Sequence, residues 1–424
     1  MSQVLIWKKV FPGSDYDIFN RTDYHGLYEH IQTKWGGVCP NWGNRLWLQG
    51  IFSALDTGEN DYHFLTGKET VDEINSIYDF IILPMANIFY RGYVEAMQGL
   101  TAIFERIKIP IYVIACGVQA DSYDCLESVI SEIGEASSNF IRSIYNTGGE
   151  FALRGFFTKE FFSRLGFHDA VVTGCPSLYQ LGLNFRVSMD KQSATEPKPV
   201  FNGRVAPLVQ VLKAYPESVF IDQCDYYQCL YQPDYLTHTG LRFMKNFVDR
   251  FDQYSATLLS QNRIVMIADM NEWSYYLKKN GFNYSFGSRI HGTIMAILSG
   301  IPSTILCCDS RTREMAEFFD IPNYVTNYGH KISVDELRKL YEQNDYARFN
   351  QTFSDKFQNF EKFLTGRGIV SHVNTENRFF TEYETLLFQD AVLNTERFKD
   401  FAKKIEKYWF ILQLPDNIKH FLRG

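Results

Sequence analysis

Hydrophobic positions in this chain form short, nearly unbroken runs of aliphatic and β-branched residues, separated by stretches with helical spacing. In the first half the runs cover residues 80–86, 109–118 and 169–179. A run without polar alternation is typical of a strand that is buried on both faces, as in a parallel sheet. Strands that alternate with helices predict a doubly wound α/β sheet.

The same pattern restarts after a polar, proline-containing segment at 186–199, which we interpret as a linker. The later runs cover 218–222, 263–269 and 303–309, and they end in Asp222, Asp269 and Asp309. From about residue 341 the pattern is helical to the end of the chain.

Three domains follow from this pattern: an N-terminal α/β domain at 1–190, a C-terminal α/β domain at 196–340, and a helical C-terminal extension at 341–424. Open α/β sheets bind ligands at the carboxyl ends of their strands. We therefore expect the functional site in a cleft between the strand ends of the two domains.

Length and composition agree with this organisation. A chain of 424 residues is long for one ordinary domain, and 45% hydrophobic with 21% charged residues is ordinary for a globular protein. The net charge of −7 argues against nucleic acid as the main partner, because nucleic-acid binding favours a basic face. A local cationic pocket for an anionic substrate remains compatible with this charge.

Targeting signals and metal motifs are absent from the pattern. The N-terminal stretch lacks a long apolar region, and no segment has 18 consecutive apolar residues. We therefore predict no signal peptide, no transmembrane helix and a cytoplasmic location. The eight cysteines lack metal-ligand spacing, so we expect reduced, buried thiols, including Cys116 and Cys175.

The stretch "FGSRIHGTIMAILSGIPSTIL" at 286–306 carries the strongest chemical signal. Residues 292–299 predict a buried apolar helix, whose N-terminus offers unpaired N–H groups to an anion. Arg289 adds a planar fork for phosphate or carboxylate, and His291 is suited to proton transfer near neutral pH. Ser288 is a hydroxyl donor, and Gly292 permits close backbone approach. The alternative is an ordinary capped helix whose arginine and histidine have structural partners.

Other candidates follow the strands of the first domain. Asn87, Gln119 and Asp121 come just after predicted strands and are expected to line the cleft. The alternative for each is a turn residue, since these residue types favour turns.

Several motifs together resemble one family. "SRIHGTIMAILSGIPSTIL", followed by "CDSRTREMAEFFDIP", resembles the C-terminal signature of the polysaccharide pyruvyl transferases. Other stretches resemble further family motifs in the family's order, so that the likeness covers roughly residues 41–369. They are "NWGNRLWLQGIFSAL", "IPIYVIACGVQA", "FALRGFFTKEFFSRLG", "VVTGCPSLY" and "YARFNQTFSDKFQNFEKFLTGRGI".

This resemblance implies a glycosyltransferase-B-like fold of two Rossmann-like domains that face each other across a cleft. The implied activity is a ketal pyruvyltransferase of surface-polysaccharide biosynthesis. It would transfer pyruvate from phosphoenolpyruvate to two hydroxyls of a sugar acceptor. Phosphoenolpyruvate is a small, dense anion that arginines and a helix N-terminus can hold, so we expect neither a metal nor another cofactor.

The resemblance also assigns roles to single residues. It implies that Arg289 and His291 bind the donor and act in catalysis, and that Arg154 is a second anion contact. Asn44 lies in the family's Gly-Asn turn. The last two matches, Asp309 and Arg313, lie in the loop after the last strand.

Alternatives and departures from the family remain at several of these positions. Arg154 would have a structural role if it paired with Glu150 or Asp169, and a local salt bridge would explain Asp309 and Arg313. The family often has an acidic residue where this chain has Gly155. It often has Gly-Asp where this chain has Asn44-Arg45.

Two other functions are compatible with the same architecture. A glycosyltransferase that uses a sugar nucleotide would hold the diphosphate with Arg289. A non-catalytic family member would bind sugar or phosphate without turnover. The sequence leaves open whether the acceptor is lipid-linked, nucleotide-linked or polymeric.

The tail at 394–412 has helical spacing of apolar residues, with lysines on the other faces. The apolar positions are Phe398, Phe401, Ile405, Tyr408 and Leu412. This pattern suggests a basic amphipathic helix that contacts an anionic membrane, where a lipid-linked acceptor would reside. The alternative is a helix that packs back on the N-terminal domain.

Overall fold

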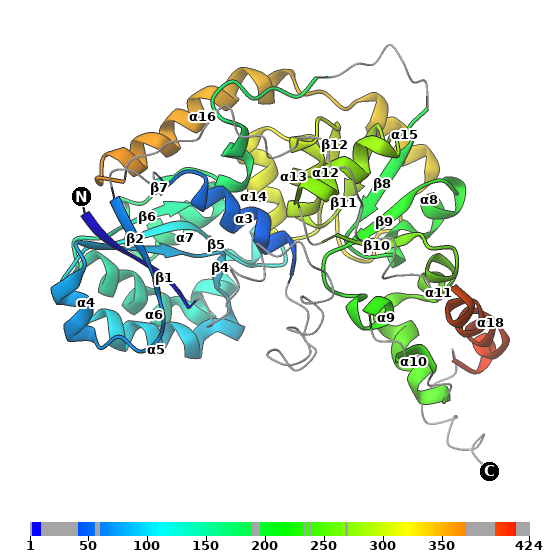
Figure 1. Cartoon of the computed structure of the whole chain (residues 1–424), viewed down its shortest axis with the longest axis horizontal. Helices are drawn as coiled ribbons and strands as arrows, with labels where there is room; N and C mark the ends of the chain where they lie inside the picture. The colour runs from blue at the N-terminus through cyan, green and yellow to red at the C-terminus, as the bar shows by residue number, and fades with distance from the viewer. Residues whose placement is uncertain are drawn as a thin grey trace.

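Two parallel β-sheets with flanking helices form the molecule (Figure 1). The computed structural model describes residues 2–9, 41–55, 60–188, 196–231, 235–237, 240–267, 270–369 and 395–412. The strand order is β2-β1-β3-β5-β6-β7 in the first sheet, where β4 also pairs with β5, and β10-β9-β8-β11-β12-β13 in the second. The predicted α/β class with two Rossmann-like parallel sheets and a helical C-terminal segment is confirmed.

The first sheet is buried on both faces. Its strands are β1 (Ser2–Lys9), β2 (Asn60–Leu65), β3 (Phe80–Pro84), β4 (Asn87–Phe89), β5 (Ile111–Val118), β6 (Glu150–Leu153) and β7 (Val171–Val172). Its helices are α3 (Gly43–Phe52), α4 (Val71–Ile77), α5 (Val94–Phe104), α6 (Leu126–Tyr145) and α7 (Phe156–Arg164). Val4 and Ile6 of β1 belong to one hydrophobic cluster, and Leu5 between them belongs to another. Successive side chains of a strand point to opposite faces, which explains the unbroken hydrophobic runs.

The second sheet repeats this arrangement. Its strands are β8 (Pro199–Asn202), β9 (Val219–Asp222), β10 (Ile264–Met266), β11 (Tyr284–Gly287), β12 (Ser303–Cys307) and β13 (Asn323–Val325). Its helices include α8 (Val209–Ala214), α9 (Tyr227–Tyr231), α10 (Leu241–Phe251), α11 (Gln253–Ser260), α12 (Met270–Lys279), α13 (Ile290–Leu298), α14 (Ser310–Phe319) and α15 (Val334–Glu342). The apolar helix predicted at 292–299 is α13, and eight of its nine residues are buried.

One predicted strand is much shorter than its hydrophobic run. Within 169–179 only β7, with two residues, is extended, and a 3₁₀ turn (Pro176–Leu181) follows. Gly174 lies between them with φ +78°, and a Cβ there would lie 2.4 Å from the Phe318 ring of α14. The chain therefore turns at Gly174 because α14 packs directly against its backbone.

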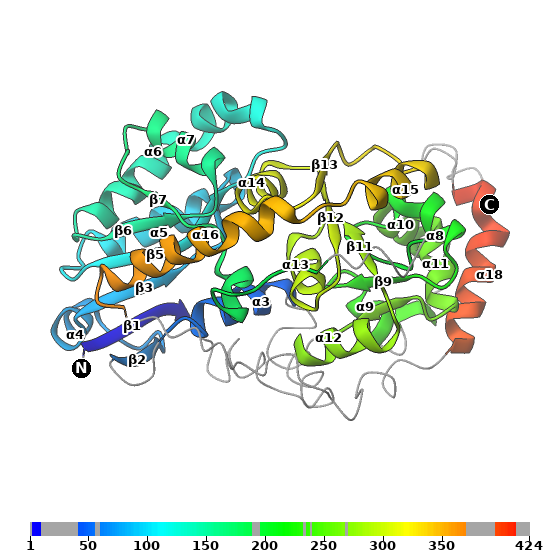
Figure 2. The same cartoon turned by 90° about the horizontal axis from the view of Figure 1, so that it is seen from above.

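A long helix, α16 (Ala347–Thr365), connects the two sheets (Figures 1 and 2). Just before it, the Tyr346 hydroxyl donates to the Ser303 carbonyl of β12 at 2.8 Å. Near its other end, Asn359 Nδ2 donates to the Val172 carbonyl of β7 at 2.8 Å. Residues after 340 thus contact both sheets. The domain boundaries at 190, 196 and 341 stay predictions, and residues 189–195 of the linker lie outside the described residues.

The tail forms the helix α18 (Thr395–Leu412), which packs against α10 and α11. The Phe401 ring lies 4.9 Å from that of Phe247 in α10, and Phe398, Ile405 and Leu412 are buried as well. The alternative prediction, that this helix packs back on the N-terminal domain, is therefore wrong about the domain. The helix packs on α10 and α11 beside the second sheet. Within the described ranges, no helix is long and apolar enough to cross a bilayer. Asp269, residue 394, and the tail segments 370–393 and 413–424 lie outside these ranges.

Candidate functional site

The carboxyl edges of the two sheets are joined through the start of α14. The Ala120 amide, just after β5, donates to Ser310 Oγ at 2.9 Å. The Ser310 amide donates back to the Ala120 carbonyl at 2.9 Å. Two cavities, of about 700 and about 490 Å³, lie elsewhere in the second half of the chain. The candidate residues line neither of them; many pack together where the strand ends of the two sheets meet.

Arg154 follows β6 and is only 2% exposed. Its Nη1 donates to Asn87 Oδ1 at 3.0 Å. Its Nε and Nη2 are buried and have no hydrogen-bond partner within the described part of the chain. Neither structural partner that was considered for Arg154 is found. Glu150 pairs with Arg367 instead, and Asp169 is exposed whereas Arg154 is buried. Buried guanidinium nitrogens rarely remain unpaired, so this arrangement suits an anionic ligand.

Gly117 in β5 allows three side chains to approach one point. A Cβ at this position would lie 3.1 Å from Glu314 Oε1, 3.2 Å from Arg154 Cδ and 3.3 Å from Asn87 Oδ1. Asn87 and Arg154 come from the first sheet, and Glu314 comes from α14 beside the second. A side chain at position 117 would displace at least one of them.

His291 lies in the first turn of α13 and is buried, with 8% exposure. Its Nε2 is 3.8 Å from Cys175 Sγ, which also accepts a hydrogen bond from Ser177 Oγ at 3.1 Å. Burial, together with the nearby guanidinium groups of Arg154 and Arg311, lowers the pKa of His291 to about 3. The imidazole is therefore neutral at pH 7, and it stays neutral well below the pH at which an ordinary histidine gains its proton.

Arg289 is the N-cap residue of α13, and its backbone and side chain are both held. Its amide donates to Asn202 Oδ1 at 2.9 Å, and its Nη2 donates to Asp225 Oδ2 at 2.6 Å. Although burial opposes it, the Asp225 carboxylate raises the pKa of Arg289. Asp222, at the end of β9, is buried beside them, and burial with the Asp225 charge raises its pKa to about 7. Arg289 thus keeps its charge, while one nitrogen of its fork already has a protein partner.

Ser288 and Gly292 flank this arginine in tightly packed backbone. A Cβ at Gly203 would lie 2.2 Å from Ser288 Oγ, so β8 and the α13 loop are in direct contact. A Cβ at Gly292 would lie 2.9 Å from Gln223 Nε2 and 3.1 Å from Asn202 Cγ. The close approach expected at Gly292 is therefore made by protein side chains.

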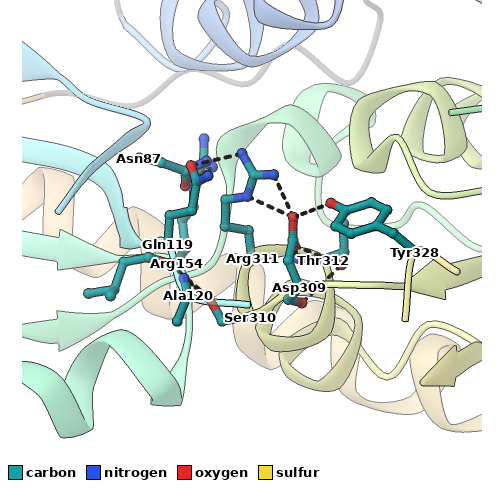
Figure 3. Close-up of polar contacts among 10 residues, drawn as sticks. Asn87, Gln119, Ala120, Arg154, Asp309, Ser310, Arg311, Thr312 and Tyr328 are labelled. Carbon is teal, nitrogen blue, oxygen red and sulfur yellow. Dashed lines mark hydrogen bonds and ion pairs between the residues drawn. The ribbon is translucent and has the colours of Figure 1, made fainter. Parts of the chain in front are cut away.

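Arg311 is a site residue that the sequence reasoning missed. Its guanidinium lies between the two halves of the molecule (Figure 3), where Nη1 donates to Gln119 Oε1 at 3.1 Å and Nε to Asp309 Oδ2 at 3.0 Å. Asp309 also caps α14 and accepts from the Tyr328 hydroxyl at 2.9 Å. Although burial opposes it, Arg311 and these hydrogen bonds hold the pKa of Asp309 below its ordinary value. The signal was available in "CDSRTRE", two residues before the arginine that we selected.

Arg313 itself points to a different set of partners. Its Nε donates to Glu317 Oε1 at 2.7 Å, and its guanidinium lies 4.1 Å from the Tyr123 ring centroid. The alternative of a local salt bridge is therefore found for both residues, Asp309 with Arg311 and Arg313 with Glu317. Asn44 and Asp121 are exposed. The structure thus brings together Arg154, Asn87, Gln119, Asp309 and His291, whereas Arg313 turns to Glu317. Asn44 follows Gly43, where a Cβ would lie 3.0 Å from His291 Cβ, so α3 passes close to this cluster.

Glu314 is the second site residue that the sequence did not indicate. It is 1% exposed, and its carboxylate accepts hydrogen bonds from the Thr158 amide at 3.0 Å and from Thr158 Oγ1. Burial raises the pKa of Glu314 to about 7, even though Thr158 and Arg154 favour its charged form. Only the packing of α14 against α7 reveals it.

Metal ligands do not cluster among the residues with described positions, where no group of three or more histidine, cysteine or acidic side chains is arranged to hold an ion. Cys116 and Cys175 are buried free thiols, as expected.

Comparisons with known proteins give one family and a set of distant structures. The sequence model described as polysaccharide pyruvyl transferase matches residues 10–310. No curated protein matches the chain. Among solved structures, MnaA of S. aureus with UDP has 10% identity and a TM-score of 0.39, with 91% of this chain and 99% of that chain covered. The glycosyltransferase SnogD from Streptomyces nogalater has 11% identity and a TM-score of 0.29, with 84% and 82% covered. Similarity this low carries no argument about ligands.

Proposed function

Because this chain belongs to the polysaccharide pyruvyl transferase family, we propose that it is a ketal pyruvyltransferase, which transfers pyruvate from phosphoenolpyruvate to two hydroxyls of a sugar. The observation that carries this proposal is Arg154, a buried guanidinium with two unpartnered nitrogens within the described ranges. A planar carboxylate or a phosphate group would satisfy both nitrogens.

The charges around Arg154 support an anionic donor. The positive charges of Arg154 and Arg311 both lower the pKa of the His291 imidazole, so both lie near it. Phosphoenolpyruvate carries its phosphate and carboxylate on one carbon, so the buried guanidinium of Arg154 and the partly exposed one of Arg311 match its charge. These cations hold the donor by hydrogen bonds, and the proposed reaction needs no divalent ion.

His291 has the properties of a base in this reaction. Arg154 and Arg311 lower the basicity of this imidazole, and a bound anion would offset their charge and raise its pKa again. The neutral ring could then accept the proton of a sugar hydroxyl as its oxygen attacks the donor. The burial of His291 and its contact with Cys175 fix the ring in place. The proposed acceptor is a sugar of a surface polysaccharide, either free or linked to a carrier.

The test combines turnover with a change at Arg154. Purified protein should release inorganic phosphate from phosphoenolpyruvate only when a suitable hexose acceptor is present, and a chelator should not stop it. The acceptor should gain the mass of one pyruvate minus water. Arg154→Ala should raise the KM for phosphoenolpyruvate about 10- to 100-fold, as expected for the loss of a charge-assisted hydrogen-bond pair.

Glu317→Gln is the matched control, because Glu317 lies on α14 and pairs with Arg313 outside the cluster around Arg154. This variant should keep the wild-type KM. Transfer of a sugar from a nucleotide sugar, without use of phosphoenolpyruvate, would overturn the proposal in favour of a glycosyltransferase. An Arg154→Ala protein with an unchanged KM and a much lower Tm would make Arg154 a structural residue.

A further inference from the structure

Glu314 is a buried carboxylic acid inside the anion site. It extends from α14 across the contact between the two halves of the molecule, and it accepts hydrogen bonds from Thr158 in the first turn of α7. A Cβ at Gly155, the N-cap residue of α7, would lie 2.9 Å from Glu314 Cβ and 3.0 Å from its Oε2. Glu314 therefore occupies the space where a side chain of position 155 would lie.

Capping of α7 alone does not account for an acid at this place. A serine, threonine or asparagine caps a helix without burying a charge. Glu314 is instead buried, and both it and Arg154 approach the same point above Gly117. Arg154 nevertheless keeps two nitrogens without a partner in the described part of the chain, so the two residues do not form a closed ion pair.

The charged and titratable groups around Glu314 come from several elements. Arg154 after β6 favours the ionised form, and Asp309 at the start of α14 opposes it. Cys116 of β5 and Tyr123 after β5 also lie near the carboxylate. Burial raises the pKa of the Cys116 thiol and of the Tyr123 hydroxyl above their ordinary values. Burial outweighs Arg154, so that the pKa of Glu314 is about 7.

We propose that Glu314 is the proton donor of pyruvyl transfer, and that binding of the donor anion causes Glu314 to take up this proton from solvent. This inference rests on the function proposed above. A phosphate and a carboxylate bound at Arg154 add negative charge beside Glu314, which favours its neutral form. The site then contains a neutral acid, Glu314, and a neutral base, His291, and the charge of Arg154 acts on both.

The O–H bond of Glu314 breaks, and the electron pair of the donor's C=C bond forms a C–H bond at the methylene carbon. The adjacent carbon becomes electron-poor, a sugar oxygen adds to it, and His291 takes the hydroxyl proton. Phosphate leaves with its bonding pair as the second hydroxyl closes the ring. The proton of the second hydroxyl passes to Glu314 and restores it, and the proton held by His291 leaves with phosphate.

Calorimetry at pH 8 in buffers of different ionisation enthalpy measures proton uptake on binding. Phosphoenolpyruvate and inorganic phosphate are the two probes. Wild-type protein should take up close to one proton per anion bound, because Glu314 is mostly ionised at that pH before binding. Glu314→Gln should bind both anions without this uptake. Its amide keeps an acceptor for Thr158, so the capping of α7 is preserved.

Turnover provides the second readout. Glu314→Gln should slow kcat about 100-fold or more, the usual scale for the loss of a general acid. Glu317→Gln, on the same helix, should retain both turnover and proton uptake. If Glu314→Gln does not fold, Glu314→Asp serves in its place and should retain the proton uptake with a reduced kcat.

The outcomes separate the two proposals. Wild-type turnover or unchanged proton uptake in Glu314→Gln overturns the role of Glu314 and leaves the pyruvyltransferase intact. If phosphate binds with Glu314-dependent proton uptake but phosphoenolpyruvate does not bind, phosphoenolpyruvate is not the donor. The protonation of Glu314 on anion binding then still stands. Binding of neither anion by the wild type overturns both.

Discussion

At the scale of single residues, the site separates an acid from a base by their surroundings. His291 and Glu314 are both buried, and burial disfavours the charged form of each. This lowers the pKa of the imidazole to about 3 and raises that of the carboxyl to about 7. The same physical cause therefore leaves one group as a proton acceptor and the other as a proton donor near pH 7.

The low pKa of His291 predicts a pH-dependent stability. The unfolded chain gains a proton on this imidazole below its ordinary pKa of about 6.5, whereas the folded protein does so only near 3. Its contribution to the free energy of unfolding is therefore present above pH 6.5 and is lost as the pH falls from 6.5 towards 3. His291→Gln should remove a difference of about 2 kcal/mol between pH 7 and pH 5. Urea unfolding at the two pH values measures it.

His63 is a control for this measurement, because its side chain is 42% exposed beside Asp61. His63→Gln makes the same chemical change at an exposed position and measures the effect of the substitution itself on the unfolding curve. A His291→Gln protein with an unchanged pH dependence would show that the imidazole titrates alike in the folded and unfolded chain.

At the scale of elements, α14 and α18 show how packing determines the role of a helix. α14 contributes Ser310, Arg311 and Glu314 to contacts with the first sheet, so one helix face builds the junction and part of the site. α18 has the composition of a membrane-surface helix. Its apolar face, however, is buried against α10 and α11.

This packing predicts that α18 does not insert into membranes. Burial of Phe398, Phe401 and Ile405 leaves little apolar surface for lipid, since interfacial binding scales with the apolar area that a helix can bury. In co-sedimentation with vesicles containing phosphatidylserine, the protein should remain in the supernatant at 150 mM salt, roughly the physiological ionic strength. Phe410, with 77% exposure, is the apolar residue through which contact could still occur. Salt-resistant sedimentation that Phe410→Ser abolishes would contradict the prediction.

At the scale of the whole molecule, one of two hydrophobic clusters extends through both sheets, while the other lies within the first domain. A single cluster contains Val4 of the first sheet, Phe286 of the second and Phe353 of α16. Tyr179 lies where these parts meet. It is fully buried, its ring centroid is 5.0 Å from that of Phe360, and its hydroxyl donates to the Thr173 carbonyl at 2.6 Å.

A shared core predicts cooperative unfolding of both halves. Scanning calorimetry should show one main transition, although chains with several domains often unfold in steps. Tyr179→Ala should shift this whole transition downward, with a loss of about 3–5 kcal/mol, as is usual for a buried aromatic residue. Ile77→Ala, at a side chain that is 52% exposed, should have little effect. Two separate transitions, of which Tyr179→Ala moves only one, would contradict a shared core.

The sequence by itself determined the local features of this protein. Unbroken hydrophobic runs predicted β3, β5, β9 and β12, because a strand that is covered on both faces must be apolar at successive positions. The apolar helix after Arg289 was predicted for the same reason. The order of short motifs indicated the family. These signals depend only on residues that are neighbours in the chain.

Tertiary structure alone decided which side chains meet. Ala120 and Ser310 are 190 positions apart, and their contact brings α14 against the first sheet. Arg311 and Glu314 enter the site through that contact, while Arg313, two residues from Arg311, turns to Glu317. The neutral state of His291 likewise follows from burial and from two guanidinium groups that distant segments supply. Charge and burial at a site are sums over long-range neighbours, and no local pattern in the chain contains them.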